Sequence, residues 1–471
     1  MVTVELIVKN CRLVQNNRIL DADMIIDNGK VKQIKKSGSD VKADRIIDAE
    51  ENLVIPGCID PHIHSREPQS PNTPINQEDF SSVTRAAAAG GYTTVFDMPV
   101  TGHPPTTTLE GFKIKKNLAE KKCLIDYALY GGAGYGNRHE IMPLAMAGVI
   151  AFKIFTREIE LEDKSWNGVI VGKGGSEAFL RIMNEVAKTR LPLSIHCEDD
   201  RLIEFQTNQL KSQGKMKASA YSKSAPNASE FIEVSRSIKL AKKTGTKIII
   251  AHLSTAEAAS MVKKAKRDGL HVYAETCPHY LLLTNIDMVE KLGPYGKIYP
   301  PLRSDHDREA LWTALKNKTI DFLANDHAPH SKESKELGWK NIFNASFGVP
   351  GLETALPLML TQVNQGRLDI FRLVEIMSRK PAMIFGINGR KGDLGVGMDA
   401  DFVIVDLKRE DVLSKENMYT KSSANVFDEY HVMGRPILTA VRGETIMQNG
   451  EIVGKAGYGE FVSTELFQGK S

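Results

Sequence analysis

Residues 58–68 read CIDPHIHSREP, a short apolar run that ends in two histidines one residue apart, His62 and His64. Side chains alternate between the two faces of a β-strand, so both imidazoles point to the same side. Two neutral imidazoles that converge on one point form half of a site for a divalent transition metal such as Zn²⁺, which binds nitrogen at about 2.0–2.1 Å. Taken alone, the pair is weak support for a metal site, because neighbouring backbone groups often satisfy such histidines.

Three later runs of the chain also end in a group that can bind a metal. LPLSI is followed by His196, KIIIA by His252 and IDFLAN by Asp326. Each run is short, β-rich and bounded by polar residues, which is typical of a buried parallel strand. The repetition of this pattern indicates that the four histidines and the aspartate belong to one site.

Between residues 56 and 390, strand-like runs alternate with helical patterns, and this alternation predicts parallel β-α units. Eight such runs are present: CIDPH, TTVFDM, DYALYG, IAFKIF, LSIHC, KIIIAHL, VYAETC and DFLAND. They predict an α/β fold, a closed (βα)₈ barrel of the TIM type, in which functional side chains gather at the carboxyl ends of the strands. The candidate metal ligands all lie at or just beyond such ends.

The two ends of the chain predict a second, smaller domain. Short alternating runs separated by Asn-Asn and Asn-Gly turns fill residues 1–55, and similar runs return after residue 391 in DFVIVDL and PILTAVRGETIMQNGEIVG. Neither end is large enough to bury a core alone. We therefore expect residues 1–55 and 391–471 to form one β-sandwich module beside a barrel of residues 56–390.

Charge and cysteine content argue against several classes of protein. The net charge of the 471 residues is +3 and the basic residues are spread along the chain, so no nucleic-acid partner is indicated. The five cysteines show no paired spacing, which argues against a disulfide framework and favours a reducing compartment. No stretch approaches the roughly 20 uninterrupted apolar residues of a membrane span. We expect a cytoplasmic protein that acts on a small molecule, without a membrane partner.

Lys153 lies inside the apolar run GVIAFKIF and has two interpretations. A charged lysine in a buried strand is costly, because burial disfavours the ammonium form. It can pair with a nearby carboxylate, or CO₂ can carboxylate its neutral amine to a carbamate whose two oxygens bridge two metal ions. We favour the carbamate, because four histidines, one aspartate and this bridge supply enough ligands for two ions about 3.5–4 Å apart.

Several stretches together resemble the cyclic amidohydrolase family, the group of the dihydroorotases, allantoinases and hydantoinases, over essentially the whole chain. The stretches are PGCIDPHIHSREP, GVIAFKIF, SIHCEDD, AHLST, ETCPHYLLL, YPPLRS, NDHAPH and GMDADFVIVD. The resemblance implies a metal-dependent hydrolase with a barrel and a flanking β module. PPLRSDHDREALWTAL and FGVPGLETALPLML are most similar to dihydroorotases.

The resemblance also implies a role for each ligand. The histidine pair of residues 58–68 would bind the more buried ion with Asp326, His196 and His252 would bind the more exposed ion, and carboxylated Lys153 would lie between them. The two divalent ions, with zinc as the first candidate, would share a hydroxide that attacks the ring amide carbonyl. Asp326 would be catalytic as well, carrying the proton to the departing nitrogen. Members of this family often form dimers or tetramers, so a homo-oligomer is expected.

Two further residues are expected to bind the substrate. Arg66 follows His64 by two positions, so it can reach the same cavity, where its forked guanidinium suits a carboxylate. Alternatively, Arg66 only pairs with Glu67 or another wall residue. In dihydroorotases the matching arginine holds the substrate carboxylate, and His330 resembles a second group that does so.

Val100 departs from the dihydroorotase pattern, because those enzymes typically carry Asn after Met-Pro and this chain reads DMPVT. Valine cannot donate a hydrogen bond to a carboxylate. The first hypothesis is a dihydroorotase, which interconverts dihydroorotate and carbamoyl-aspartate in pyrimidine biosynthesis. The alternative is an allantoinase or a hydantoinase, and a non-catalytic scaffold relative is a third hypothesis.

A few other residues near the motifs stay outside the predicted ligand set. His279 and His327 are interpreted as structural or supporting groups, because the ligands are complete without them. Tyr299 differs from the Asn or Ser common in relatives and has no assigned role. Residues 331–347 are interpreted either as a surface excursion or as a mobile flap over the site.

Overall fold

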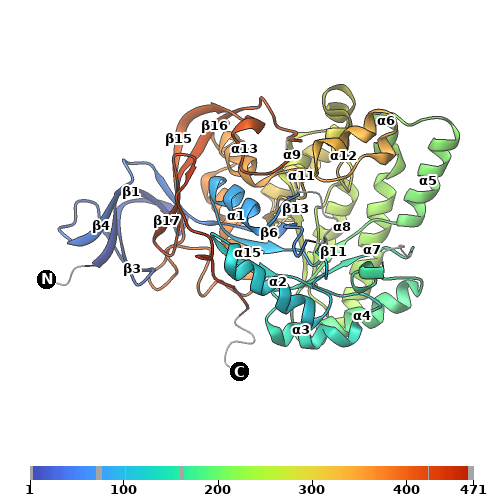
Figure 1. Cartoon of the computed structure of the whole chain (residues 1–471), viewed down its shortest axis with the longest axis horizontal. Helices are drawn as coiled ribbons and strands as arrows, with labels where there is room; N and C mark the ends of the chain where they lie inside the picture. Colours follow the sequence, from blue (N-terminus) through green and yellow to red (C-terminus); the bar gives the residue numbers. More distant parts are fainter. Residues whose placement is uncertain (1–3, 70–76, 101, 160–163, 423, 465–471) are drawn as a thin grey trace.

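The computed structural model describes residues 4–69, 77–100, 102–159, 164–422 and 424–464. A barrel wrapped in helices lies at one end of the long axis, and a β-sheet module built from both ends of the chain lies at the other (Figure 1). Among the described helices, none is both long and apolar enough to cross a bilayer.

The barrel strands are short and parallel, and the order in which they pair follows the sequence. They are β6 (Cys58–Ile63), β7 (Tyr92–Asp97), β8 (Asp126–Leu129) with its continuation β9 (Gly131–Gly132), β10 (Phe152–Phe155), β11 (Leu193–His196), β12 (Ile248–Ile250), β13 (Val272–Thr276) and β14 (Phe322–Leu323). Ile63 bridges in parallel to His327, just after β14, and this bridge closes the ring. The predicted barrel is confirmed.

Helices cover the outside of the barrel between successive strands. Their bounds are α1 Phe80–Ala89, α2 Leu109–Lys122, η1 Arg138–Glu140, α3 Ile141–Ala147, η2 Lys164–Gly168, α4 Gly175–Thr189, α5 Asp200–Ser212, α6 Ala218–Ser224, α7 Asn227–Thr244, α8 Ala256–Arg267, α9 Pro278–Leu282, α10 Asn285–Asp287, η3 Met288–Leu292, η4 Gly293–Gly296, α11 Asp305–Lys316, α12 Lys332–Glu336, η5 Leu337–Trp339, η6 Ile342–Asn344, α13 Leu352–Asn364, α14 Ile370–Val374, η7 Glu375–Arg379 and α15 Lys380–Ile384.

Helix α4 illustrates why these segments are helical. Its buried residues Phe179, Ile182, Met183 and Val186 recur three or four positions apart, so one apolar stripe faces the barrel. Each such side chain contributes about 1.5–3 kcal/mol when it is buried. Inside the ring, side chains from several strands and from the segment around α15 pack into a separate cluster, as expected for a filled barrel.

The β module is one hydrogen-bonded sheet that joins the two ends of the chain. Its strands are β1 (Val4–Gln15), β2 (Arg18–Asp27), β3 (Lys30–Lys36), β4 (Ala43–Asp48), β5 (Leu53–Pro56), β15 (Phe402–Val412), β16 (His431–Val441), β17 (Glu444–Gln448) and β18 (Glu451–Ile452), with η8 (Lys415–Asn417) between β15 and β16. β5 pairs with both β1 and β15, so the predicted union of the two chain ends is confirmed. Buried residues of β1, β2, β5, β15 and β16 share one apolar cluster.

The end of the described chain returns to the barrel. Tyr127 in β8 donates its backbone N–H to Glu460, and Val462 donates to the carbonyl of Tyr127. The segment around these residues therefore lies along the barrel, although the sequence analysis groups it with the β module. The domain boundaries at residues 55 and 391 stay a prediction.

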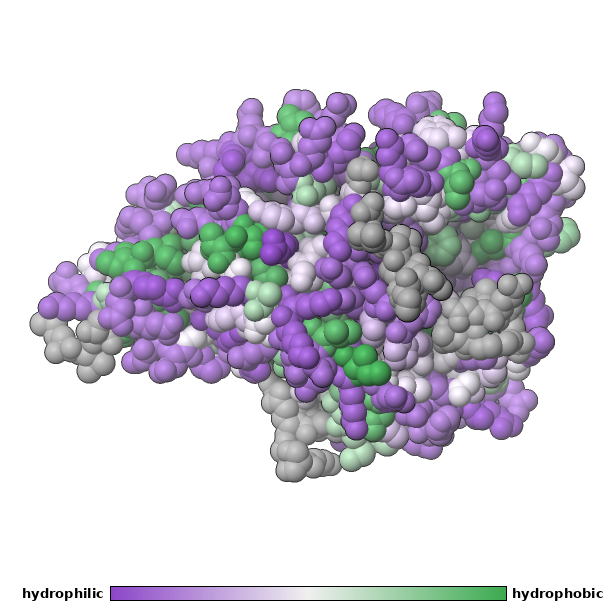
Figure 2. Space-filling model, viewed as in Figure 1, coloured by the Kyte–Doolittle hydropathy of each residue, from purple (hydrophilic) through white to green (hydrophobic). Residues whose placement is uncertain are grey.

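Hydrophilic side chains cover most of the face shown in Figure 2, and apolar side chains gather there in small patches over the β module and over the region of α2 and α3. A surface of this kind is ordinary for a globular protein.

Candidate active site

A cavity of about 400 Å³ opens where the carboxyl ends of the barrel strands meet. All eight predicted site residues line it: His62, His64, Arg66, Lys153, His196, His252, Asp326 and His330. These residues come from five different strands or the segments that directly follow them, and the barrel brings them to one rim. Their individual roles stay predictions.

Three of the residues that line this cavity have a left-handed backbone conformation that ordinary residues rarely adopt. Their φ angles are 57° at Arg66, 36° at His252 and 46° at Asp326. Such conformations cost about 1–3 kcal/mol each and persist only where the surroundings enforce them. Their concentration at one cavity marks it as a functional site.

His62 and His64 face the same carboxylate. His62 Nε2 lies 3.3 Å and His64 Nε2 3.2 Å from Asp326 Oδ1. Burial by itself raises the pKa of Asp326, but the two histidines outweigh it and hold this pKa well below its ordinary value. Asp326 is therefore a carboxylate aimed at two imidazole nitrogens.

His196 and His252 form the second half of the cluster. His196 Nδ1 lies 3.0 Å from His252 Nε2, and the ring of His252 lies 5.5 Å from that of His62. Burial lowers the pKa of both residues, so each imidazole is neutral and keeps a lone pair that can bind a metal ion. Ligand atoms of His62, His252 and Asp326 all lie within 4.8 Å of one another, close enough to share one cation.

Lys153 lies on β10 with its amine inside this cluster. Nζ is buried and has no hydrogen-bond or ion-pair partner among the described residues. The alternative of a lysine paired with a carboxylate is therefore not what the structure contains. Burial is also the main cause of the lowered pKa of Lys153.

These residues fit a metal site on grounds of their own chemistry. Buried nitrogens without partners are costly. In the part of the chain that the structure describes, Nδ1 of His64 and of His252 find no hydrogen-bond partner, as is also true of Lys153 Nζ. Neutral imidazoles, a carboxylate and an amine that converge on one point are ligands that divalent transition metals prefer.

The sequence as a whole supports the same conclusion. Residues 53–446 match the Amidohydrolase family. The chain belongs to the amidohydrolase family. It is 38% identical to an L-hydantoinase of Paenarthrobacter aurescens, with 98% of this chain and 99% of that protein covered, and 36% identical to a dihydroorotase of Methanosphaera stadtmanae, with 95% and 97% covered. The solved structure of an L-hydantoinase from Arthrobacter aurescens superposes with a TM-score of 0.92 at 37% identity, covering 98% of this chain and 100% of that one.

The prediction of a hydrolase acting on cyclic amides is therefore confirmed at the level of the group. The two relatives are named for different substrates, so their names do not identify the substrate of this amidohydrolase. The residues that line its cavity bear on that question directly.

Arg66 and His330 form a pair at the rim of this amidohydrolase's cavity. Arg66 Nη2 donates to His330 Nε2 at 2.8 Å, and its other bonds go to the backbone carbonyls of Ala328 and Pro329. Burial lowers the pKa of His330 to about 2 and that of Arg66 to about 10, so the histidine is neutral and the arginine charged. Arg66 makes no ion pair with Glu67, which instead bonds Lys122.

Aromatic side chains form another wall of the cavity. Tyr299 stacks on His196 with ring centroids 4.4 Å apart, and Phe347 lies 5.5 Å from Tyr299. Phe155 lies 5.0 Å from His196 on another side. Tyr299, for which the sequence indicated no role, therefore holds a predicted ligand in place by stacking.

Val100 belongs to this apolar surface as well. It lines the cavity and packs in a cluster with Val169 and Ile170, against which Trp166 also packs. No hydrogen-bond donor therefore stands at position 100 to contact a substrate carboxylate.

Sequence reasoning missed two carboxylates that hold the histidines. Glu275 Oε1 lies 2.5 Å from His62 Nδ1, and Glu198 Oε2 lies 3.1 Å from His196 Nε2. Each bond leaves the other ring nitrogen facing the cluster, as carboxylates behind metal-binding histidines commonly do. The available signal was their position: Glu275 lies on β13 and Glu198 follows β11 by two residues.

The two histidines kept outside the predicted ligand set are buried elsewhere. His327 Nδ1 accepts hydrogen bonds from the backbone N–H groups of Gly351 and Leu352, at the start of α13. His279 packs against Tyr280, with ring centroids 4.3 Å apart. Neither lines the cavity.

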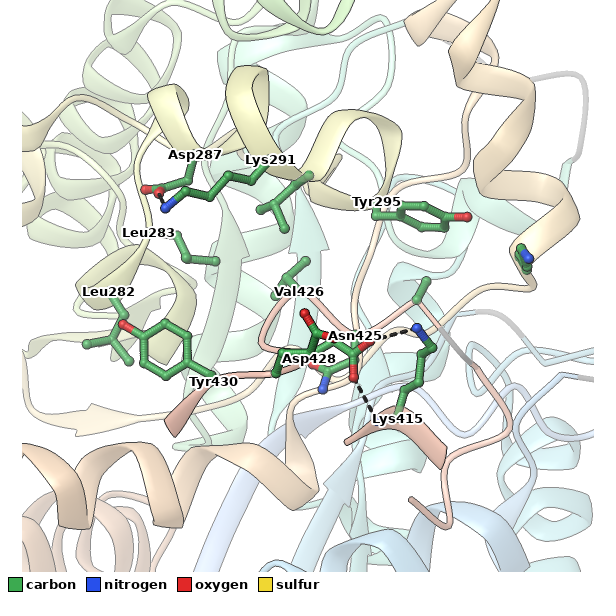
Figure 3. Close-up of a pocket in the computed structure, with 14 residues that line it drawn as sticks. Leu282, Leu283, Asp287, Lys291, Tyr295, Lys415, Asn425, Val426, Asp428 and Tyr430 are labelled. Atoms are coloured by element: carbon green, nitrogen blue, oxygen red, sulfur yellow. Dashed lines mark hydrogen bonds and ion pairs between the residues drawn. The ribbon is translucent and has the colours of Figure 1, made fainter. Parts of the chain in front are cut away.

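Two other features of this amidohydrolase resemble sites, a group of three aspartates and a second cavity. Asp126, Asp399 and Asp401 are close enough to share a cation, but the ammonium group of Lys391 already pairs with all three. A cavity of about 580 Å³ lies beside η3 and the connection from β15 to β16 (Figure 3). Four of its charged residues pair with one another, Lys291 with Asp287 and Lys415 with Asp428.

Proposed function

We propose that this amidohydrolase opens a cyclic amide that carries a carboxylate, with dihydroorotate as the first candidate substrate. The observation that carries the proposal is Arg66. It is buried at the cavity, has no carboxylate partner among the described residues, and its Nη1 makes no hydrogen bond to them. Glu78, Asp326 and Asp97 favour the charge of Arg66 without forming an ion pair with it. A buried guanidinium without an ion pair is costly, so a substrate carboxylate is a chemically suitable partner.

A second candidate is a hydantoin with an apolar substituent at position 5. Val100 removes one polar contact to a carboxylate, and the rings of Phe155, Tyr299 and Phe347 offer an apolar surface instead. Losing one hydrogen bond of this kind costs about 1–3 kcal/mol. The hydantoinase name of one relative points in the same direction.

The proposed metal site has two halves. His62, His64 and Asp326 would hold one divalent cation, and His196 with His252 would hold the other, with zinc the first candidate for both. A carbamate on Lys153 would lie between the halves. Its formation joins the lysine nitrogen to the carbon of CO₂ and releases one proton.

When bound, the cations would polarise the amide carbonyl and activate a water molecule. The protein's own groups prepare that chemistry. Glu275 and Glu198 each hold one histidine, His62 and His196 respectively, in one tautomer. Arg66 orients the substrate ring by binding the carboxylate of the substrate. Asp326 accepts a proton from the attacking water and delivers it to the ring nitrogen as the C–N bond breaks.

Turnover of four substrates by the purified protein tests the proposal: dihydroorotate, allantoin, 5-benzylhydantoin and dihydrouracil. The highest kcat/KM on dihydroorotate, with ring closure of carbamoyl-aspartate in the reverse direction, is the expected result. A higher kcat/KM on 5-benzylhydantoin would instead identify a hydantoinase, and a higher kcat/KM on allantoin an allantoinase. Hydrolysis of none of the four would overturn it.

Two further expectations stay predictions. A reducing, cytoplasmic environment is consistent with five cysteines that are all buried and unpaired. Assembly into a homo-oligomer rests on the habit of the family alone, and sedimentation of the purified protein measures it.

A further inference from the structure

Two segments that contain none of the predicted metal ligands bring Tyr299 and Phe347 to the aromatic wall of the cavity. Residues 331–347 contain α12, η5 and η6, and they end in Ser346 and Phe347, which line the cavity. Residues 293–299 begin with η4 and end at Tyr299, which also lines it. The position of each ring therefore depends on how the two segments are fastened together.

Two buried lysines fasten the segments reciprocally. Lys335 Nζ, on α12, donates to the carbonyls of Lys297 at 2.8 Å and Tyr295 at 3.3 Å. Lys297 Nζ donates back to the carbonyls of Ala345 at 2.6 Å and Phe343 at 3.1 Å. We call Lys297 and Lys335 the lysine clasp, since each amine bonds the backbone of the other segment.

The clasp is connected directly to the residues at the cavity. The carbonyl of Lys297 also accepts the backbone N–H of Gly348, the residue after Phe347, at 3.0 Å. Tyr299 lies two residues beyond Lys297, and the rings of Tyr299 and Phe347 are 5.5 Å apart. Phe347 also lies 6.5 Å from His330, so it borders the Arg66–His330 pair.

The chemistry of the clasp is unusual for ordinary structural residues. Lys335 is fully buried and Lys297 is 5% exposed, yet neither forms an ion pair within the described residues. Burying an ammonium without a carboxylate is costly. Burial lowers the pKa of Lys335 well below its ordinary value and that of Lys297 to about 8. An apolar residue would fill the same space at a lower free-energy cost of burial. Lysine is therefore explained at these two positions by the hydrogen bonds that its amine donates.

From this geometry we infer that the lysine clasp is a specificity device: Lys297 and Lys335 are positioning residues that hold Tyr299 and Phe347 where a ring substituent of the substrate must fit. The inference rests on the proposed function and deepens it. The clasp would act on substrates that carry a substituent, whether carboxylate or apolar, and would leave an unsubstituted ring unaffected, since such a ring needs only the metal ligands and Asp326.

The test compares Lys335→Met and Lys297→Met, which keep volume and remove the donors, with Lys332→Met as the control. Lys332 lies on the same helix, its side chain is largely exposed, and it forms an ion pair with Glu336 at 3.8 Å. Two readouts are taken for each variant. One is KM and kcat on dihydroorotate, 5-benzylhydantoin and dihydrouracil, and the other is hydrogen exchange of the backbone amides of residues 331–348.

We expect both clasp variants to raise KM for the substituted substrates by about tenfold, because small misplacements of a positioning group have effects of this size. KM for dihydrouracil, and kcat for all three substrates, should stay within about twofold of the values for the unmodified protein. The amides of Ser346 and Gly348, which bond the carbonyls of Ser334 and Lys297, should exchange faster than in the control. Lys335→Gln, which restores one donor, should recover part of the lost affinity.

Several results would overturn the inference. Unchanged KM values for every substrate would do so, and so would an equal fall of kcat on all three, which indicates a purely structural role. If the unmodified protein hydrolyses no cyclic amide, the proposed function fails separately, and hydrogen exchange still tests the clasp: equal exchange in Lys335→Met and the control would overturn it. Where Lys335→Met does not fold, Lys335→Gln and Lys297→Met carry the same comparison.

Discussion

Arg66 is the residue on which the substrate assignment depends. Its backbone is strained at a φ of 57°, and its guanidinium is held by two backbone carbonyls and His330, while Nη1 bonds none of the described residues. A strained residue with an unused donor at a cavity is better explained by ligand binding than by folding.

Arg66→Ala should lower kcat/KM on dihydroorotate by about a hundredfold or more, since it removes the only proposed charge partner of the carboxylate. Activity on dihydrouracil and the metal content should be retained. Arg201→Ala, which removes an exposed arginine paired with Glu158, is the matched control. Equal turnover of dihydroorotate by the Arg66 variant and the control would contradict the assignment.

Glu275 is expected to matter through His62. Glu275→Gln keeps the shape of the side chain but removes the charge behind the histidine, and loss of such a partner typically weakens metal binding about 10–100-fold. Chelator titration of the zinc-loaded protein measures this, with the exposed Glu257→Gln as the control. Equal zinc affinity in both variants would show that Glu275 only fills space.

That the six candidate metal ligands gather at one rim could be predicted from sequence, because five of them end or directly follow an apolar run, Lys153 lies inside one, and parallel strands end on the same rim. The supporting carboxylates could not. A glutamate on a buried strand looks the same whether it holds a histidine, as Glu275 does, or pairs with a lysine. That difference depends on which strand lies next to it, and pairing is a property of the fold.

At the scale of elements, α13 depends on a histidine outside it. Its N-cap residue Gly351 offers no side chain to cap the first N–H groups, and His327 Nδ1 accepts two of them instead. Burial lowers the pKa of His327 to about 3, so the ring stays neutral and able to accept them at ordinary pH.

His327→Leu should destabilise the protein by about 1–3 kcal/mol, because it leaves buried N–H groups at the start of α13 without acceptors. Chemical denaturation measures the loss. His327→Asn keeps an acceptor at this place and should lose less. A fall in metal stoichiometry with unchanged stability would instead identify His327 as a ligand.

The elements themselves were predictable to different degrees. Strands such as β11 and β13 follow from their apolar runs, whereas β12 and β14 have only three and two residues and depend on their neighbours in the ring. For residues 331–347 the sequence left a surface excursion and a flap open. The structure places short helices there, and buried Lys335 fastens them to the neighbouring segment. The sequence could not show this, because composition does not tell whether a lysine is buried or exposed.

At the scale of the whole molecule, a buried ion cluster joins the barrel to the β module. Lys391 pairs with Asp126 on β8, with Asp399 at 3.0 Å and with Asp401 at 2.6 Å, and Arg442 in the turn between β16 and β17 also pairs with Asp126. Burial opposes the charge on Lys391, but the three carboxylates outweigh it and raise the pKa of Lys391 above its ordinary value. The ammonium group of Lys391 likewise helps to hold the pKa of Asp399 below its ordinary value.

These shifts set the pH range of the stabilisation. A raised lysine pKa stabilises the fold fully below the unfolded value near 10.5, and this contribution is lost as pH rises through the folded value. A lowered aspartate pKa stabilises it above the unfolded value near 3.9, and that contribution is lost as pH falls through the folded value. The stabilising contributions of Lys391 and Asp399 are therefore both fully present at neutral pH.

Lys391→Met should cost about 3–5 kcal/mol at pH 7.5, since it leaves buried carboxylates without their cation. The loss should shrink toward pH 4, because protonation then removes the uncompensated charge. Lys30→Met is the control: Lys30 bonds the same Asp399 from the surface, and such pairs contribute about 1 kcal/mol or less. An equal loss at both pH values would contradict this account of the cluster.

The architecture at this scale was largely predictable, since eight β-α units imply a barrel and two weak β ends imply one module. The path of the last described residues along β8 was not, because Phe461 and Val462 have no periodic pattern around them and are placed by tertiary contacts.

We propose that six side chains from five strand ends, with His62 on β6 and His64 directly after it, hold two divalent cations. Anomalous diffraction from crystals grown with zinc tests it most directly. The account predicts two peaks about 3.5–4 Å apart, one beside His62 and His64 and one beside His196 and His252, with density extending beyond Nζ of Lys153 to bridge them. Peaks elsewhere, or a Lys153 amine that ends in an ion pair with a carboxylate, would contradict it.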